Sequence, residues 1–347
     1  MHDFSSSSIN RLFVQFVGNK SGDEGVRFSG NELELTGELK DCLQNYFLTS
    51  FRDCEYYNLY HESDICLNEV YTYVSAIFED PGCLHEQSVN LAKHLYEQSV
   101  HPKIKGGEFY VVYFSDCIIE GETVDAVGLF KSENKDTFLK VYQEQDGFTI
   151  DAETGININR LDKGCLIFNS EKEKGYLVSV VDNTGKGNDA QYWTDRFLHV
   201  RPRNDGFFQT KNLLSLTKSF VVEKLPEQFE MTRADQAELL NRSVKFFREK
   251  DSFEMDEFAS EVLAEPEVID SFKSYKSKFE QERDIELNDN FSISEAAVKK
   301  QSRVFRSVIK LDRNFHIYVH GDHQKIIKGY DEETGMHFYQ LFFKEES

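Results

Sequence analysis

The feature that most constrains the fold is a change of hydrophobic period at Gly106-Gly107. Before it, apolar residues recur at helical spacing through residues 67–78, a stretch that Pro81-Gly82 ends. After it, Glu108–Cys117 reads EFYVVYFSDC, which is rich in the β-branched and aromatic residues typical of strands. The two periods occupy separate blocks, so the sequence predicts an α+β fold in which helices pack on a sheet.

The first two thirds of the chain carry the signals for this helix-on-sheet domain. Short apolar runs at 124–131, 138–142, 164–169 and 175–182 have turn residues between them. This spacing predicts an antiparallel meander. Helical patterns near 36–47, 84–99, 188–199 and 210–224 predict the helices that cover it. We therefore expect an N-terminal α+β domain over residues 1–225.

Pro226 marks the expected domain boundary. Residues 227–290 are acidic, and their apolar positions recur at helical spacing. Strand-like runs follow at 304–311, 314–320, 325–330 and 336–343. The sequence thus predicts a second domain, residues 226–347, in which an acidic helical segment leads to a smaller C-terminal antiparallel sheet.

Charge is distributed unevenly along the 347 residues. The chain has 61 Asp+Glu against 40 Lys+Arg, a net charge of −21. Residues 299–328 nevertheless carry eight cations against Asp312 and Asp322, a local charge of +6. Residues 196–218 carry five cations against Asp205, a local charge of +4. Such a local field can hold a polyanion while the rest of the chain repels it.

The expected DNA contacts are therefore the cations of these two segments. Phosphate contacts need positive charge and no special side-chain geometry. The principal candidates are Lys299, Lys300, Arg303, Arg306 and Lys310, and the secondary candidates are Arg201, Arg203 and Lys211. The same cations could instead neutralise the acidic helices of 227–290 or an acidic partner, and charge alone leaves both readings open.

Catalytic, metal and membrane motifs are lacking in the sequence. Lys20-Ser21 has no glycines in the positions of a phosphate-binding loop, and the chain contains no HExxH. His316, His320 and His323 lie close in sequence without a fixed-spacing thiol or carboxylate partner. We expect no enzyme activity, cofactor or metal, although a hydrolase built from distant carboxylates remains a third hypothesis.

Compartment signals favour the cytosol. No apolar run approaches about 18 residues, so we expect no membrane span. The N-terminus lacks a basic region followed by an apolar run, and the six cysteines include no CxxC pair. The sequence predicts reduced thiols in a cytoplasmic protein.

Several segments together resemble a known family. They are Lys105–Phe114 (KGGEFYVVYF), Tyr176–Asn183 (YLVSVVDN), Ala190–Leu198 (AQYWTDRFL), Thr210–Leu214 (TKNLL) and the strands from Phe315 onward. This order of motifs is similar to that of the bacterial nucleoid-associated NdpA family, from about Arg11 to Phe343.

The resemblance implies a non-enzymatic cytoplasmic protein of the bacterial nucleoid that binds DNA and contacts topoisomerases. One departure is that Gly185–Asp189 carries a single cation where the family has a basic run. We therefore expect weak, sequence-tolerant DNA binding through the later basic segments. The alternative is an acidic interaction or regulatory module that binds a DNA-processing protein such as a topoisomerase, and a homo-oligomer stays open.

Overall fold

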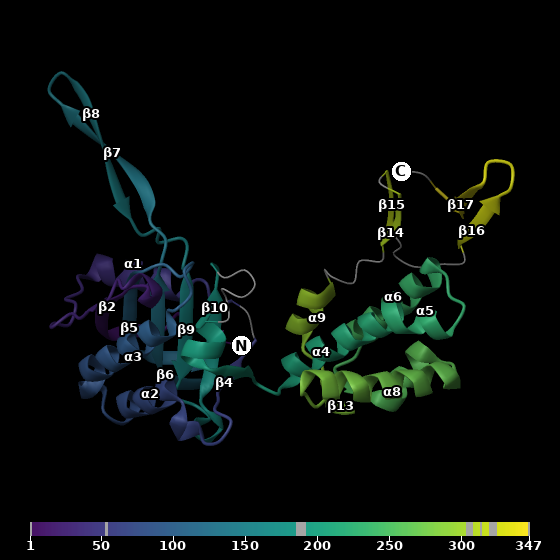
Figure 1. Cartoon of the computed structure of the whole chain (residues 1–347), viewed down its shortest axis with the longest axis horizontal. Helices are drawn as coiled ribbons and strands as arrows, with labels where there is room; N and C mark the ends of the chain where they lie inside the picture. The colour runs from purple at the N-terminus through teal and green to yellow at the C-terminus, as the bar shows by residue number, and fades with distance from the viewer. Residues whose placement is uncertain are drawn as a thin grey trace. The chain divides into compact units, whose positions relative to one another are not determined.

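The computed structural model describes residues 2–52, 55–184, 192–302, 308–312, 314–318 and 325–345. Contacts divide the chain into two compact units, unit 1 (Met1–Arg203) and unit 2 (Asn204–Ser347), which Figure 1 shows in purple to teal and in green to yellow. This division falls before the boundary expected at residues 225/226. The reason is that α4 (Gly206–Ser219) packs against α9 (Glu295–Ser302) and so belongs to unit 2.

Unit 1 is built on a nine-stranded antiparallel sheet. The order is β11-β4-β10-β9-β6-β5-β2-β3, and β1 pairs with β5. The strands are β1 (His2–Asp3), β2 (Ser8–Val17), β3 (Val26–Arg27), β4 (Tyr57–Leu59), β5 (Gly107–Ile119), β6 (Glu122–Ser132), β9 (Lys163–Phe168), β10 (Leu177–Asp182) and β11 (Val200–Pro202). The helices are α1 (Gly37–Leu48), α2 (Glu69–Glu79) and α3 (Leu84–Gln98), followed by the π-helix Tyr192–Leu198.

Helices cover both faces of this sheet. This explains why apolar and polar residues do not alternate along most of β5. Side chains alternate between the two faces along a strand. Phe109, Val111 and Tyr113 join the core with α2 and α3. Tyr110, Val112 and Phe114 join the core with α1. Because both sets are buried, the strand reads as a continuous apolar run.

Gly107 allows the close approach at which β5 begins. A Cβ atom at this position would lie 1.8 Å from the carbonyl oxygen of Ser132, the last residue of β6. No larger residue fits there without moving the strand. The glycine pair that marks the change of period thus also starts the central hairpin of the sheet.

One predicted strand of the meander lies outside the sheet. Residues 138–142 belong to β7 (Asp136–Glu144), whose one partner among the described strands is β8 (Gly147–Gly155). β8 was not predicted from the sequence. Figure 1 shows the two strands as an arm that leaves the body of unit 1.

Unit 2 is helical around an aromatic core. Its helices are α4, α5 (Leu225–Gln228), α6 (Arg233–Glu249), α7 (Met255–Phe258), α8 (Pro266–Arg283) and α9. Two π-helical turns, Phe220–Lys224 and Ala259–Leu263, extend α4 and α7. A small sheet pairs β12 (Ser252–Glu254) with β13 (Asn290–Ser292). Phe253 in β12 is fully buried and stacks on Phe247 and Phe291, with ring centroids 5.6 and 5.0 Å away.

The C-terminal strands form two separate hairpins. They are β14 (Val308–Leu311) with β15 (Phe315–Tyr318), and β16 (Ile326–Asp331) with β17 (Met336–Leu341). Leu311 and Ile326 both pack near Ala237 of α6. The predicted α+β class, with its helical segment and antiparallel C-terminal strands, is confirmed.

Candidate nucleic-acid interface

The first two candidate cations lie on α9. Ser294 precedes the helix, and its hydroxyl accepts a hydrogen bond from the amide of Ala297 at 3.4 Å. Ala297 and Val298 are buried on the side that packs against α4 and α6. Lys299 and Lys300 are exposed. The buried pair fixes the helix on unit 2 and directs the two lysines to solvent.

Arg248 is a further cation that lines the same cavity as Lys299, and it was not predicted from the sequence. It is exposed in the last turn of α6 and lines the same cavity of about 490 Å³ as Lys299, together with Val298 and Ser302. Within the described residues, neither Arg248 nor Lys299 forms an ion pair, so both guanidinium and ammonium are available. A cation in the last turn of a helix is common because the helix dipole favours it, so its position alone did not indicate a site.

The other lining charges limit the positive field of this cavity. Lys250 is bound by Glu257 at 2.6 Å and by Glu261 at 3.1 Å. Asp251 and Glu295 add two carboxylates. The attraction for an anion therefore rests on Arg248 and Lys299, with the exposed neighbour Lys300.

Lys300 and Lys211 lie on two helices that pack together. The ammonium of Lys300 is 5.7 Å from the centroid of the Phe207 ring at the start of α4. Lys211 is half-buried on α4. The structure thus brings Lys211, Lys299 and Lys300 into one unit.

Arg201 and Arg203 lie in unit 1 and differ in availability. Arg203 donates to Glu120 at 2.7 and 3.2 Å and to Glu171 at 2.6 Å. A phosphate would have to compete with both carboxylates for this guanidinium. Arg201 is exposed on the edge strand β11, with its guanidinium 4.5 Å from the centroid of the Tyr60 ring.

Three principal candidates lie wholly or partly outside the described residues. Arg303 and Arg306 fall outside the described residues. Lys310 is in β14, where His316 is its cross-strand partner, and its side chain is not described. These three positions stay predictions.

A buried pair of lysines lies in the sheet of unit 1. Lys131 and Lys163 are cross-strand partners and are at most 1% exposed. Tyr192 lies over both, with its ring centroid 5.5 Å and 5.0 Å from the two ammonium groups. Burial lowers the pKa of Lys131, and the nearby carboxylate of Glu133, at 3.1 Å, opposes this effect.

The lysine pair does not offer free charge to a ligand. Lys163 donates to both oxygens of Asp182, and Lys131 donates to the carbonyl of Lys105 as well as to Glu133. A cavity of about 270 Å³ opens beside Lys163 and Tyr192. Because each ammonium already has an anionic partner, we assign this cluster to the stability of the sheet.

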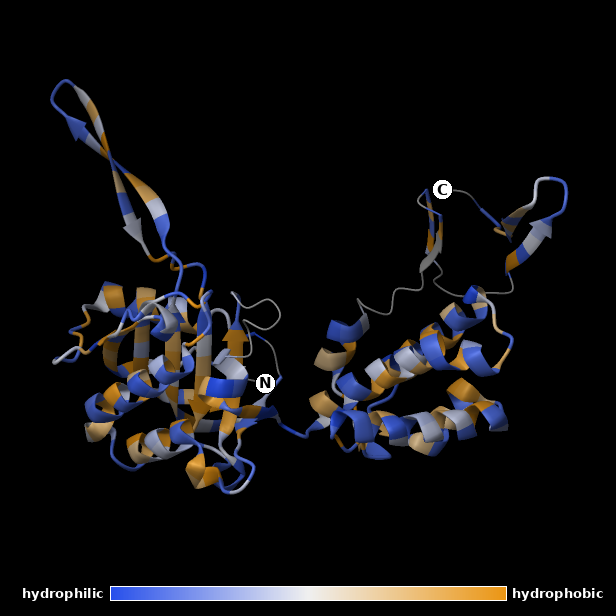
Figure 2. Cartoon of the chain, in the orientation of Figure 1, coloured by the Kyte–Doolittle hydropathy of each residue, from blue (hydrophilic) through white to orange (hydrophobic). Residues whose placement is uncertain are grey.

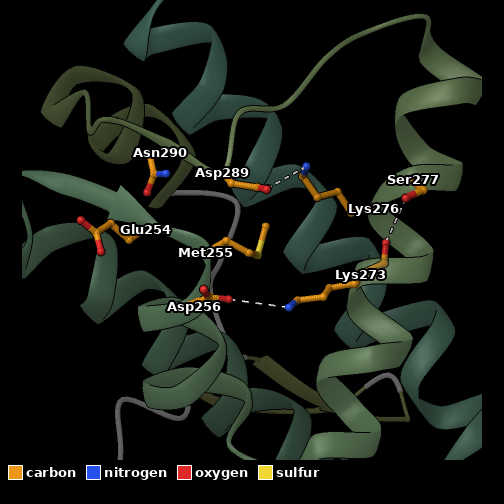
Figure 3. A pocket seen from close by; sticks show the side chains of 8 residues that line it. All are labelled: Glu254, Met255, Asp256, Lys273, Lys276, Ser277, Asp289 and Asn290. Atoms are coloured by element: carbon orange, nitrogen blue, oxygen red, sulfur yellow. Dashed lines mark hydrogen bonds and ion pairs between the residues drawn. The ribbon is translucent and has the colours of Figure 1, made fainter.

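A third cavity, in unit 2, has the opposite charge. Figure 3 shows its lining, with Lys273 pointing to Asp256 and Lys276 pointing to Asp289. The ion pairs measure 3.7 and 3.1 Å. Glu254 adds a carboxylate that forms no ion pair with any residue the structure describes. This cavity of about 430 Å³ suits a basic group better than a phosphate.

Among the residues that the structure describes, no three His, Cys, Asp or Glu side chains form a group that could hold a metal ion. His320 and His323 lie outside those residues. Cys42, Cys66, Cys83, Cys117 and Cys165 are free thiols. No helix in the described ranges is long and apolar enough to cross a bilayer.

Comparison with known proteins identifies the family. The family model described as nucleoid-associated protein YejK matches residues 14–336, which is most of the chain. No curated protein matches the sequence. The match agrees with the resemblance to the NdpA family, and the chain therefore belongs to the nucleoid-associated YejK family.

Proposed function

We propose that the protein binds DNA in the bacterial nucleoid through the exposed cations of unit 2. The observation that carries this proposal is the pair Arg248 and Lys299, which line one cavity and form no ion pair within the described residues. Lys299 is also the first residue of the segment 299–328, whose local charge is +6. Membership of a nucleoid-associated family supports the same partner and a cytoplasmic location.

The contact would be electrostatic and would not read the base sequence. Exposed lysine and arginine side chains contact phosphates without selecting bases, so affinity should be weak and sequence-tolerant. The net charge of −21 repels DNA elsewhere on the chain, which confines binding to the local patch. On this proposal the protein has no enzymatic activity of its own.

A salt titration tests the proposal. Duplexes of unrelated sequence should bind with similar affinity, and log K should fall with log salt by about 0.9 per neutralised phosphate. Three to five contacts give a slope of about −3 to −4.5. If the purified chain does not bind DNA at low salt, the proposal is wrong.

The second candidate function is recognition of a basic, DNA-processing protein such as a topoisomerase. The observation that favours it is the acidic cavity with Glu254, Asp256 and Asp289 (Figure 3). Binding to a purified bacterial topoisomerase without DNA, lost in Glu254→Gln/Asp256→Asn, would support this function. Full retention of such binding in the variant would exclude the cavity as the contact.

A further inference from the structure

The β7–β8 hairpin exposes large apolar side chains. Leu139 and Val141 in β7 are 70% and 60% exposed, and Phe148 and Ile150 in β8 are 72% and 64% exposed. Within the described residues, none of the four belongs to a hydrophobic cluster of either unit. Figure 2 shows hydrophobic residues along the strands of this arm, away from the body of unit 1.

The register of the hairpin separates its residues into two unlike faces. Residues directly opposite one another in an antiparallel pair lie on the same face, and neighbours along a strand alternate. The face of Val141 and its partner Ile150 holds only uncharged residues. These are Thr137, Leu139, Val141, Gln143, Phe148, Ile150, Ala152 and Thr154.

All charged residues of the two strands lie on the other face. They are Asp136, Lys140, Glu144, Asp151 and Glu153, with Phe138 and Tyr142 between them. Lys140, the one cation of these two strands, forms an ion pair with Glu153 at 2.7 Å. We refer to the uncharged set as the apolar face and to this set as the charged face.

A two-stranded hairpin of this kind is only marginally stable alone in water. Independent stability normally needs a third strand or a packed hydrophobic face. An exposed apolar surface rimmed by polar residues is also typical of an interaction site. We therefore expect the apolar face to be covered by another surface.

We propose that this surface is the apolar face of a second copy of this chain. Two copies that meet face to face bury no charge, because the surface is uncharged and a two-fold interface is formed by the same patch on both sides. Elsewhere the net charge of −21 opposes self-association. DNA does not fit this face, since it lacks cations and the opposite face has four carboxylates and one lysine.

The size of the face sets the expected strength of the dimer. Four apolar side chains about two-thirds exposed present on the order of 450 Å² per copy. With the flanking Thr, Gln and Ala residues, two copies bury roughly 1,000 Å² in total, close to the lower limit for a specific interface. The association should therefore be reversible and depend on concentration.

Analytical ultracentrifugation of the full chain tests this proposal. From about 1 µM to a few hundred µM, the wild type should pass from monomer to dimer. Val141→Thr/Ile150→Thr keeps two strand-favouring, β-branched residues while removing apolar contact, and should raise the dissociation constant at least tenfold. The matched control, Phe138→Thr/Tyr142→Thr, makes two substitutions on the charged face and should change it less than twofold.

Amide exchange gives a second readout that needs no variant. Exchange of residues 136–155 should slow as the wild-type concentration rises, because the dimer covers the face. A wild type that is monomeric throughout would overturn the proposal. So would a dimer that the two double variants weaken equally, or one that the apolar-face variant leaves unchanged.

Discussion

The ammonium of Lys163 donates to both carboxylate oxygens of Asp182, at 2.8 Å each, and the two residues are direct cross-strand partners in β9 and β10. Lys163 is 1% exposed and the side chain of Asp182 is 10% exposed. A buried pair of this kind depends on both members, because either charge alone would lie desolvated in the sheet.

Removing Lys163 should therefore destabilise unit 1 strongly. Lys163→Met leaves the Asp182 carboxylate without its cation, and we expect a loss of about 3–5 kcal/mol in the free energy of unfolding. Urea unfolding followed by the fluorescence of Trp193, the single and fully buried tryptophan, measures this in unit 1. Lys172→Met breaks the exposed pair with Glu79 and is the matched control, for which the midpoint should barely move.

Charge reversal at the proposed interface should weaken DNA binding. Arg248→Glu/Lys299→Glu removes two exposed cations, so the salt slope should become shallower by about 1.8 and the affinity should fall at every salt concentration. Lys245→Glu/Lys278→Glu changes the net charge equally at two lysines that are each 71% exposed and paired within their own helices. If this control weakens binding as much, net charge and not the interface decides affinity.

The aromatic core of unit 2 should unfold separately from unit 1. Phe253→Ala opens a cavity among Phe247, Phe258 and Phe291, and should cost unit 2 about 3–5 kcal/mol. Circular dichroism at 222 nm, which is dominated by helices, should show an earlier transition. The Trp193 transition should stay in place, and a parallel shift of both signals would show that the units unfold together.

Stability should fall at alkaline pH. Burial raises the pKa of Cys117 from 9.0 to about 12 and that of Tyr46 from 10.0 to about 12. Both groups keep their protons in the folded state while the unfolded chain loses them. Their contribution is complete below about pH 9 and is lost as the pH rises toward about 12.

Urea midpoints of unit 1 at pH 8, 9, 10 and 11 check this sign. A midpoint that rises over that interval would contradict it. Cys117→Ala should flatten the decline between pH 9 and 10, because the tyrosines of the unfolded chain ionise later.

Local sequence indicated many of the helices and strands of this protein, and it indicated the family. The stripe at 67–78 became α2, and the run after Gly107 became β5, because hydrophobic period selects between helix and strand before any tertiary contact is specified. The order of these motifs along the chain identified the family. The position of the basic segment could be read from the same information.

Only the tertiary structure decided which of these elements pair and which of their side chains meet. The period of two in residues 138–142 indicates a strand but not its partner, so the separate β7–β8 hairpin could not be predicted. Three of the contacts described above join residues that are distant in sequence. They are the ion pair of Lys163 with Asp182, the ion pairs of Arg203 with Glu120 and Glu171, and the shared cavity of Arg248 and Lys299. A charge count treats all cations alike, whereas only packing determines which of them are already neutralised and which face the solvent.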